Sequence, residues 1–252
     1  MSRALILFDI DGTLMLTGGA GSRCLRRAGR AILGEAFQWC PVQSGLLDPQ
    51  IFAQLAQHNG VDQPDLLHDM FRKCYLRELE QELAHIGDDV VVLPGVRALL
   101  DALLTRAHEY GDVTLGLLSG NYRRAAELKL AAAHLDWATF TITALAEDGQ
   151  SRDDLPLAAM RQYQGLKGTP VRARHVVIIG DTPRDVACAK AHACQIIAVA
   201  TGFYSMEQLR AAGARHVLPN LAHPDAFHYV MRCAGLMADQ PVDDGDQSST
   251  ST

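Results

Sequence analysis

The sequence predicts an α/β fold in which a parallel sheet is covered by helices on both faces. Three short apolar runs end abruptly at polar residues or glycine, as buried parallel strands do; they are Ala4–Phe8, Val113–Leu118 and Val176–Ile179. A fourth run, Ile196–Val199, follows soon after the third. Helical patterns separate these runs, and the alternation of strands with helices is typical of a parallel sheet.

The helices of this core are expected where apolar residues recur at helical spacing, namely at Val96–His108, Ala125–His134, Leu155–Gln162 and Asp185–His192. After the first strand the alternation stops, and the chain predicts three consecutive helices at Arg23–Phe37, Pro49–His58 and Pro64–His85. The second and third have an acid near the cap and a proline in the first turn, which is a common helix start. The sequence therefore predicts a Rossmann-like sheet with an inserted all-helical domain.

A chain of 252 residues is long for one minimal domain and short for two full ones. We therefore expect one core, formed by residues 1–17 and 93–238, and a helical insertion at 18–92. Residues 239–252 are rich in Asp, Ser and Thr and nearly free of large apolar side chains, which predicts a disordered tail.

Composition and charge exclude several classes of protein. Hydrophobic residues make up 48% of the chain and the formal net charge is −6, so a basic nucleic-acid scaffold is not expected. There is no apolar run long enough to cross a membrane, and the N-terminus lacks the pattern of a secretory leader. The six cysteines are scattered, which favours reduced thiols in a cytoplasmic protein. The oligomeric state stays open between a monomer and a homodimer.

Two aspartates follow the first strand in the segment Phe8-Asp9-Ile10-Asp11-Gly12-Thr13. Side chains at positions i and i+2 of an extended backbone point the same way, so Asp9 and Asp11 are expected to face one spot. That spot lies at the carboxyl end of a parallel strand, where open α/β sheets bind ligands. Two adjacent carboxylates repel each other unless a cation or a proton separates them. The pair therefore indicates a nucleophile and an acid/base that share a Mg²⁺ site.

Polar residues also follow two other predicted strands. Ser119-Gly120-Asn121 comes after the second, where a hydroxyl and helix-start amides can bind a phosphate oxygen, although the same triplet is common in simple turns. Asp181 directly follows the third strand, and Asp185 lies one helical turn further on. Because Mg²⁺ takes one or two protein carboxylates plus water, Asp181 is the expected ligand, and Asp185 is expected to hold a ligand water or a nearby cation.

Taken in this order, each at a strand end, the motifs resemble those of the haloacid dehalogenase superfamily of phosphohydrolases over about residues 4 to 202. The resemblance implies that Asp9 is a nucleophile forming an aspartyl-phosphate and that Asp11 is the acid/base. It further implies that Ser119 holds the phosphoryl group and that Asp9, Asp181 and the backbone of Asp11 hold Mg²⁺. The helical insertion resembles the cap domain of that superfamily.

The superfamily also uses a lysine or arginine between the second and last motifs. Arg152 precedes the predicted helix Leu155–Gln162, as the usual arrangement requires, and we expect it to bind phosphate. The alternative, Lys167, lies so close to Asp181 that little room remains for an intervening helix. The alternative for Arg152 is a surface ion pair with the neighbouring Asp153 or Asp154.

Within the superfamily, phosphoglycolate-phosphatase-like enzymes are the nearest resemblance. It rests on FDIDGTL at the first strand, on LPGV at Leu93–Val96, and on a Gly-x-x-Asp loop matched by Gly45 and Asp48. In such enzymes this loop helps to shape the substrate pocket, and Leu46 and Leu47 make it more apolar here. The resemblance implies a phosphatase acting on a small phosphorylated metabolite. A sugar-phosphate mutase and a catalytically idle member that binds a phospholigand or a protein are the alternatives.

Two basic or flexible segments have competing interpretations. Arg23, Arg26, Arg27 and Arg30 form a stripe on one face of a predicted helix; a solvated face is the usual outcome, and attraction of an anionic substrate is the alternative. The glycines of Gly18–Gly21 do not match a dinucleotide-binding motif, so we interpret them as a hinge between core and cap.

Overall fold

The computed structural model describes residues 3–237, and its centre is a parallel sheet of six strands in the order β5-β4-β1-β6-β7-β8. The strands are β1 (Ala4–Phe8), β4 (Val113–Leu118), β5 (Ile142–Ala144), β6 (Val176–Gly180), β7 (Gln195–Val199) and β8 (His216–Leu218). The strand β1 lies in the middle, where Ile6 pairs with Leu115 on one side and Val177 on the other. The apolar runs of the sequence are thus the fully buried centre of the sheet, as expected.

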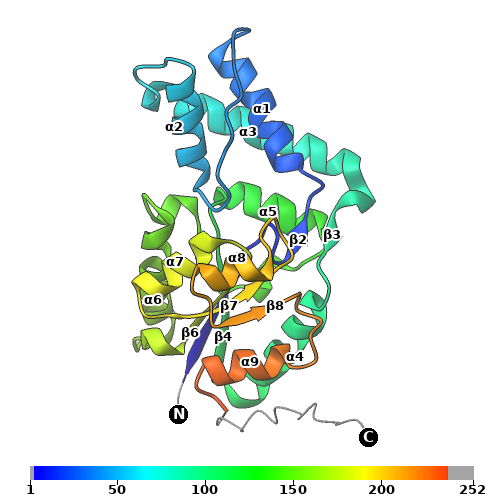
Figure 1. Ribbon diagram of the computed structural model, residues 1–252, viewed down its shortest axis with the longest axis vertical. Coiled ribbons are helices and arrows are strands. Elements are labelled where there is room, and N and C mark those ends of the chain that lie inside the picture. Colours follow the sequence, from blue (N-terminus) through cyan, green and yellow to red (C-terminus); the bar gives the residue numbers. More distant parts are fainter. Residues whose placement is uncertain (1–2, 238–252) are drawn as a thin grey trace, which may run out of the picture.

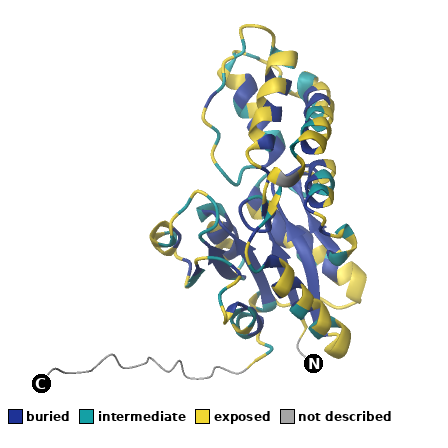
Figure 2. Cartoon of the chain, turned by 90° about the vertical axis from the view of Figure 1, so that its right-hand side faces the viewer, coloured by how far each residue is buried: buried dark blue, intermediate teal, exposed yellow. Residues whose placement is uncertain are grey.

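Helices cover both faces of the sheet, which confirms the predicted fold class (Figure 1). The core helices are α4 (Val96–Tyr110), α5 (Arg123–Ala132), α6 (Leu155–Lys167), α7 (Pro183–Ala191), α8 (Met206–Ala211) and α9 (Ala226–Cys233), with short 3-10 turns η2 (Trp137–Thr139), η3 (Ala146–Asp148), η4 (Arg152–Asp154) and η5 (Ala173–His175). Successive side chains of β1 point to opposite faces, so Leu5 and Leu7 pack with α6 and α7 while Ile6 and Phe8 pack with α4, α5 and α9. Figure 2 shows the central strands of the sheet buried and the helices buried along their inner sides only.

The inserted helices stand over one end of the sheet (Figure 1). They are α1 (Ala20–Leu33), α2 (Asp48–His58) and α3 (Asp65–Ile86), followed by the turn η1 (Gly87–Asp89). The chain leaves and re-enters the core through two short antiparallel strands, β2 (Met15–Leu16) and β3 (Val91–Val92). The two crossings therefore lie side by side, as a connection between two parts of one chain requires.

Several elements differ from those expected. The helix α1 ends at Leu33 rather than Phe37, because Gly34 has φ +93° and so leaves the helical region. The strands β5 and β8 and the helices α8 and α9 are not among the predicted elements. The expected disordered tail, residues 239–252, lies outside the described residues. Within residues 3–237, no helix combines the length and apolar character needed to cross a membrane.

Candidate active site

The predicted site residues of the three buried strands meet at one edge of the sheet. Asp9 follows β1, Ser119 follows β4 and Asp181 follows β6, and all three line one cavity. This cavity has a volume of about 730 Å³ and lies between the carboxyl ends of the strands and the inserted helices. Such an edge is where open α/β sheets bind ligands.

Asp9 is buried beside a cation. Its Oδ1 lies 3.2 Å from the guanidinium of Arg152, and its carboxylate also accepts a hydrogen bond from Ser119. Burial raises the pKa of Asp9 above its ordinary value, and the charge of Arg152 offsets part of that rise. Arg152 is only 5% exposed, although it lies in the sequence between a serine and two aspartates that suggest a surface turn. The structure therefore places Arg152 at the candidate nucleophile.

Asp181 faces Asp9 across the strand ends. One carboxylate oxygen each from Asp9, Asp181 and Asp185 lies within 4.8 Å of the others. Burial raises the pKa of Asp181, and the neighbouring charge of Asp9 raises it further. Thr13 donates a hydrogen bond to Asp181 at 3.2 Å. Closely spaced buried carboxylates are donors that a hard divalent cation prefers, and Mg²⁺ takes one or two of them, so Asp9 and Asp181 fit Mg²⁺.

The backbone around Asp181 leaves no room for further side chains. A Cβ on Gly12, where φ is +82°, would come within 2.4 Å of the Asp181 carboxylate, and one on Gly202 would also collide with it. These glycines let two loops close over Asp181, which fixes the position of its carboxylate.

Both carboxylate oxygens of Asp185 are already used by the protein. Its Oδ1 accepts a hydrogen bond of 2.5 Å from Arg152, and its Oδ2 accepts hydrogen bonds from the backbone amide and the hydroxyl of Thr182. Asp185 thereby holds Arg152 in place beside Asp9. Because both of its oxygens already accept hydrogen bonds, Asp185 supports Arg152 and is not a free metal ligand.

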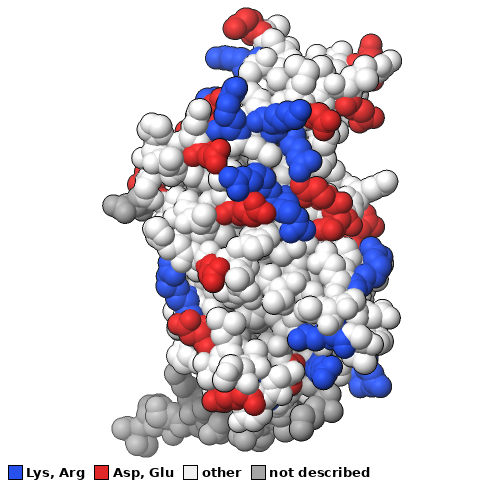
Figure 3. Space-filling view, turned by 180° about the vertical axis from the view of Figure 1, so that it is seen from behind, with Lys and Arg blue, Asp and Glu red and all other residues white. Residues whose placement is uncertain are grey.

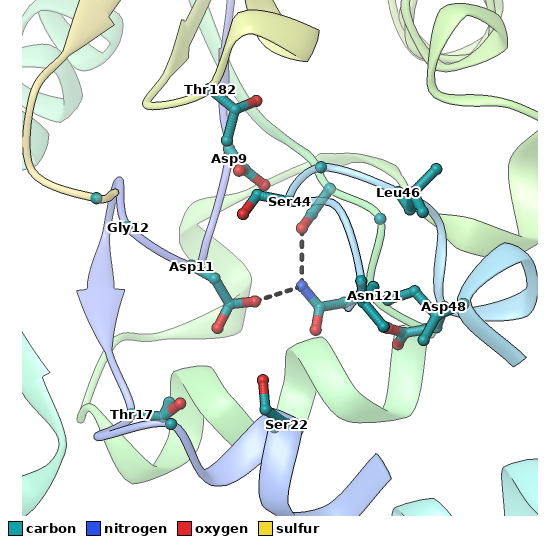
Figure 4. A pocket seen from close by; sticks show the side chains of 18 of the residues that line it. Asp9, Asp11, Gly12, Thr17, Ser22, Ser44, Leu46, Asp48, Asn121 and Thr182 are labelled. Carbon is teal, nitrogen blue, oxygen red and sulfur yellow. Dashed lines mark hydrogen bonds between the residues drawn. The ribbon is translucent and has the colours of Figure 1, made fainter. Parts of the chain in front are cut away.

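Asp11 is held by two neighbours that leave one of its oxygens free. Its Oδ2 accepts hydrogen bonds from the side-chain amide of Asn121 at 2.8 Å and from the ammonium of Lys129 at 2.5 Å. Figure 4 shows Asp11 turned toward Asn121, on the side of the cavity that Ser22 also faces. The amide of Asn121 donates to Ser119 as well, so its side chain bridges the first two motifs.

Lys129 is a site residue that the sequence analysis missed. It is buried, lies on α5, and bonds both Asp11 and the side-chain carbonyl of Asn121. The available signal was periodicity, because Lys129 falls on the same helix face as the buried Ala125 and Ala126. A lysine on the apolar face of a helix needs a polar partner in the interior.

The loop around Gly45 and Asp48 packs against the second motif. The backbone amide of Asp48 donates to the carbonyl of Gly120 at 2.7 Å, and the Asp48 carboxylate accepts from the amide of Tyr122 at 2.8 Å. Burial raises the pKa of Asp48 to about 7, and the charge of Lys129 offsets part of this effect. Gly45, with φ +80°, lies against Thr182 and Arg184. The loop therefore forms a wall of the cavity and touches two of the core motifs.

The remaining candidates lie in different surroundings. Lys167 is exposed at the end of α6 and does not line the cavity. Within the arginine stripe of α1, Arg23 and Arg27 form ion pairs with Glu82 and Glu78 of α3, so part of the stripe joins two helices instead of standing free in solvent. Figure 3 shows basic and acidic side chains interleaved over the upper part of the molecule. Arg26 lines the cavity, as do Gly18, Gly19 and Gly21.

Buried carboxylates at strand ends, next to a buried arginine and a large cavity, are the features of a candidate active site. A family model for haloacid dehalogenase-like hydrolases matches residues 6–190, and the chain belongs to this family. This confirms the family expected from the motifs.

A curated relative and several solved structures are similar to this chain over most of its length. A phosphoglycolate phosphatase from Rhodospirillum rubrum is 29% identical over 228 residues, covering 86% of this chain and 87% of the relative. CbbY from Rhodobacter sphaeroides, solved with phosphate, has a TM-score of 0.69 at 20% identity and covers 88% of this chain and 96% of its own. A β-phosphoglucomutase from Clostridium difficile has a TM-score of 0.70 at 14% identity, covering 93% and 98%. At these identities the two structures show that the fold is shared.

Proposed function

We propose that this hydrolase is a Mg²⁺-dependent phosphatase that cleaves a small phosphomonoester through an aspartyl-phosphate on Asp9. The observation that carries the proposal is the placement of Asp9, which is buried with Arg152 on one side and Asp181 on the other. The similarity to a phosphoglycolate phosphatase supports the same reaction class.

In the first step, a carboxylate oxygen of Asp9 attacks the phosphorus and the bond from phosphorus to the ester oxygen breaks. Asp11 gives a proton to the departing alcohol. In the second step, Asp11 takes a proton from water, the water oxygen attacks the phosphorus, and the bond to Asp9 breaks. One acid/base thus serves both halves of the reaction.

Positive groups are needed because a carboxylate and a phosphate repel each other. Arg152 offers its guanidinium beside Asp9, and Lys129 and Asn121 hold the Asp11 carboxylate by one oxygen so that the other can exchange a proton. Asp9 and Asp181 would hold Mg²⁺, which supplies charge that offsets the repulsion during attack. Ser119 and the amides that follow it are placed to bind phosphoryl oxygens.

We further propose that residues 18–92 act as a cap over the core. Contacts between the two parts support this role: Arg72 pairs with Glu147 at 2.7 Å, and Glu80 pairs with Arg124 at 3.0 Å. Exposed pairs of this kind contribute little stability each, so they can break and re-form as a cap opens and closes.

Hydrolysis of p-nitrophenyl phosphate tests the proposal. Turnover is expected with Mg²⁺, and it is expected to disappear in EDTA and in Asp9→Asn, which keeps the shape of the side chain but removes the nucleophile. Turnover that survives Asp9→Asn would overturn the assignment. A protein without turnover that still binds inorganic phosphate would be the catalytically idle member of the family.

A further inference from the structure

The two ends of the cavity differ in chemistry. The end at the sheet carries the charged and polar groups described above. The inserted segment contributes mainly apolar side chains to the cavity wall, namely Leu25, Trp39, Val42, Leu46 and Ile51, although Ser22, Arg26, Gln43 and Ser44 also line it, and Phe203 is added from a loop of the core. Phe203 is 93% exposed, which is unusual for so large an apolar side chain. A ligand with its phosphate at the sheet would place its other end among these groups.

The cavity is larger than a two-carbon phosphate ester needs. Its volume of about 730 Å³ falls within the range of roughly 300–1,000 Å³ found for pockets that enclose drug-sized ligands. A small, doubly charged ester would leave the apolar wall in contact with water, whereas a larger apolar group would cover it and gain the free energy of burial. The size of the cavity therefore favours a phosphate ester whose alcohol part is apolar and larger than two carbons.

Trp39 and Arg26 give this wall a flat surface. The guanidinium carbon of Arg26 lies 4.9 Å from the centre of the Trp39 ring, and both residues line the cavity. The neighbouring Arg23 and Arg27 are directed to glutamates of α3, but Arg26 is stacked on the indole instead. A guanidinium stacked on an aromatic ring is a surface on which another planar ring packs well.

We infer that the substrate is a phosphomonoester whose alcohol carries an aromatic ring, and that Trp39 is a specificity-determining residue for that ring. The inference rests on the proposed phosphatase function. It differs from a preference for phosphoglycolate, whose carboxylate would instead pair with Arg26, a cation that lines the same wall.

A comparison of two alkyl phosphates with leaving groups of the same class tests the inference. Benzyl phosphate and ethyl phosphate are both esters of primary alcohols, so a difference in kcat/KM reports on contacts to the ring. We expect a lower KM for benzyl phosphate, by roughly tenfold, and loss of that preference in Trp39→Ala. The ratio between two substrates is insensitive to the fraction of protein that folds.

The chain contains a matched control for this substitution. Its second tryptophan, Trp137, is also partly buried and also lies under an arginine, with Arg123 at 5.9 Å, but it does not line the cavity. Trp137→Ala is expected to keep the preference for benzyl phosphate. Binding can be followed without turnover in Asp9→Asn combined with Trp137→Phe, where Trp39 is the remaining tryptophan and its emission should shift when benzyl phosphate binds.

Three results would overturn the inference. Equal kcat/KM values for the benzyl and ethyl esters would show that the apolar wall of the cavity does not bind the aromatic ring preferentially. A higher kcat/KM for phosphoglycolate than for benzyl phosphate, with that advantage lost in Arg26→Gln, would assign Arg26 to an anion. In both cases hydrolysis itself would persist, so the proposed phosphatase function would stand. Absence of hydrolysis with every ester would instead remove the proposed function and this inference together.

Discussion

Replacement of Arg152 by alanine removes a cation that contacts both Asp9 and Asp185. In the structure its guanidinium lies 3.2 Å from Asp9 and 2.5 Å from Asp185, and both carboxylates are buried. Without it, two negative groups remain in the interior with no opposite charge between them. Removing one partner of a buried ion pair costs about 3–5 kcal/mol, because the other charge is left uncompensated.

The free energy of unfolding of Arg152→Ala in urea is therefore expected to be lower than that of the wild type by about 3–5 kcal/mol. Mg²⁺ should recover part of the loss, since Asp9 and Asp181 can then share a cation. At a temperature where the variant is folded, kcat/KM should fall by roughly 10²–10³-fold, the loss typical when one donor to a developing negative charge is removed. The matched control is Lys167→Ala at an exposed position, which should stay within about 0.5 kcal/mol of the wild type and keep its activity.

A stability loss below about 1 kcal/mol for Arg152→Ala would show that the buried charges are compensated in another way. Normal activity in Arg152→Ala together with lost activity in Lys167→Ala would mean that the wrong base was assigned to phosphate binding.

Three further substitutions test other parts of the site. Because burial raises the pKa of Asp48 to about 7, folding retains a proton there that the unfolded chain loses above about pH 4. Ionisation of Asp48 therefore lowers the free energy of unfolding as the pH rises from about 4 to 7. In urea titrations with Mg²⁺ at several pH values, Asp48→Asn should become more stable relative to the wild type across that range. A difference in free energy of unfolding between the two proteins that does not change with pH would contradict the raised pKa of Asp48. A Cβ on Gly120 would lie 2.1 Å from the carbonyl oxygen of Leu46, so Gly120→Ala should push the loop away and raise KM, whereas Gly165→Ala, which meets no atom within 4 Å, should leave steady-state kinetics unchanged. Lys129→Met should lower kcat by roughly 10–100-fold through misplacement of Asp11, with partial recovery in Lys129→Arg, and equal losses in both variants would argue against a positioning role.

Much of the fold follows directly from the sequence, because buried parallel strands are continuous apolar runs. β1 and β4 have the expected bounds, and the fully buried runs leave few alternatives. β5 and β8 are three residues each, too short for a periodic pattern, and their existence depends on pairing with β4 and β7, from which α5 and α8 separate them along the chain. Local signals cannot reveal such strands.

The candidate site divides in the same way. Asp9, Asp11 and Asp181 are visible in the sequence because they directly follow strands that the sequence itself marks. Lys129 is not, because its role depends on the angle at which α5 crosses the sheet and brings the ammonium to Asp11. Arg152 is an intermediate case, since its place before a helix is predictable and its burial is not.

The most direct test of the central proposal is to find where the phosphoryl group goes during turnover. The enzyme is mixed with benzyl phosphate and Mg²⁺, quenched in acid within the first turnover, digested and mapped by mass spectrometry. We expect a phosphoryl group on the peptide that contains Asp9, and none in Asp9→Asn or in EDTA. A phosphoryl group on another residue, or hydrolysis that continues in Asp9→Asn, would contradict the assignment of Asp9 as the nucleophile.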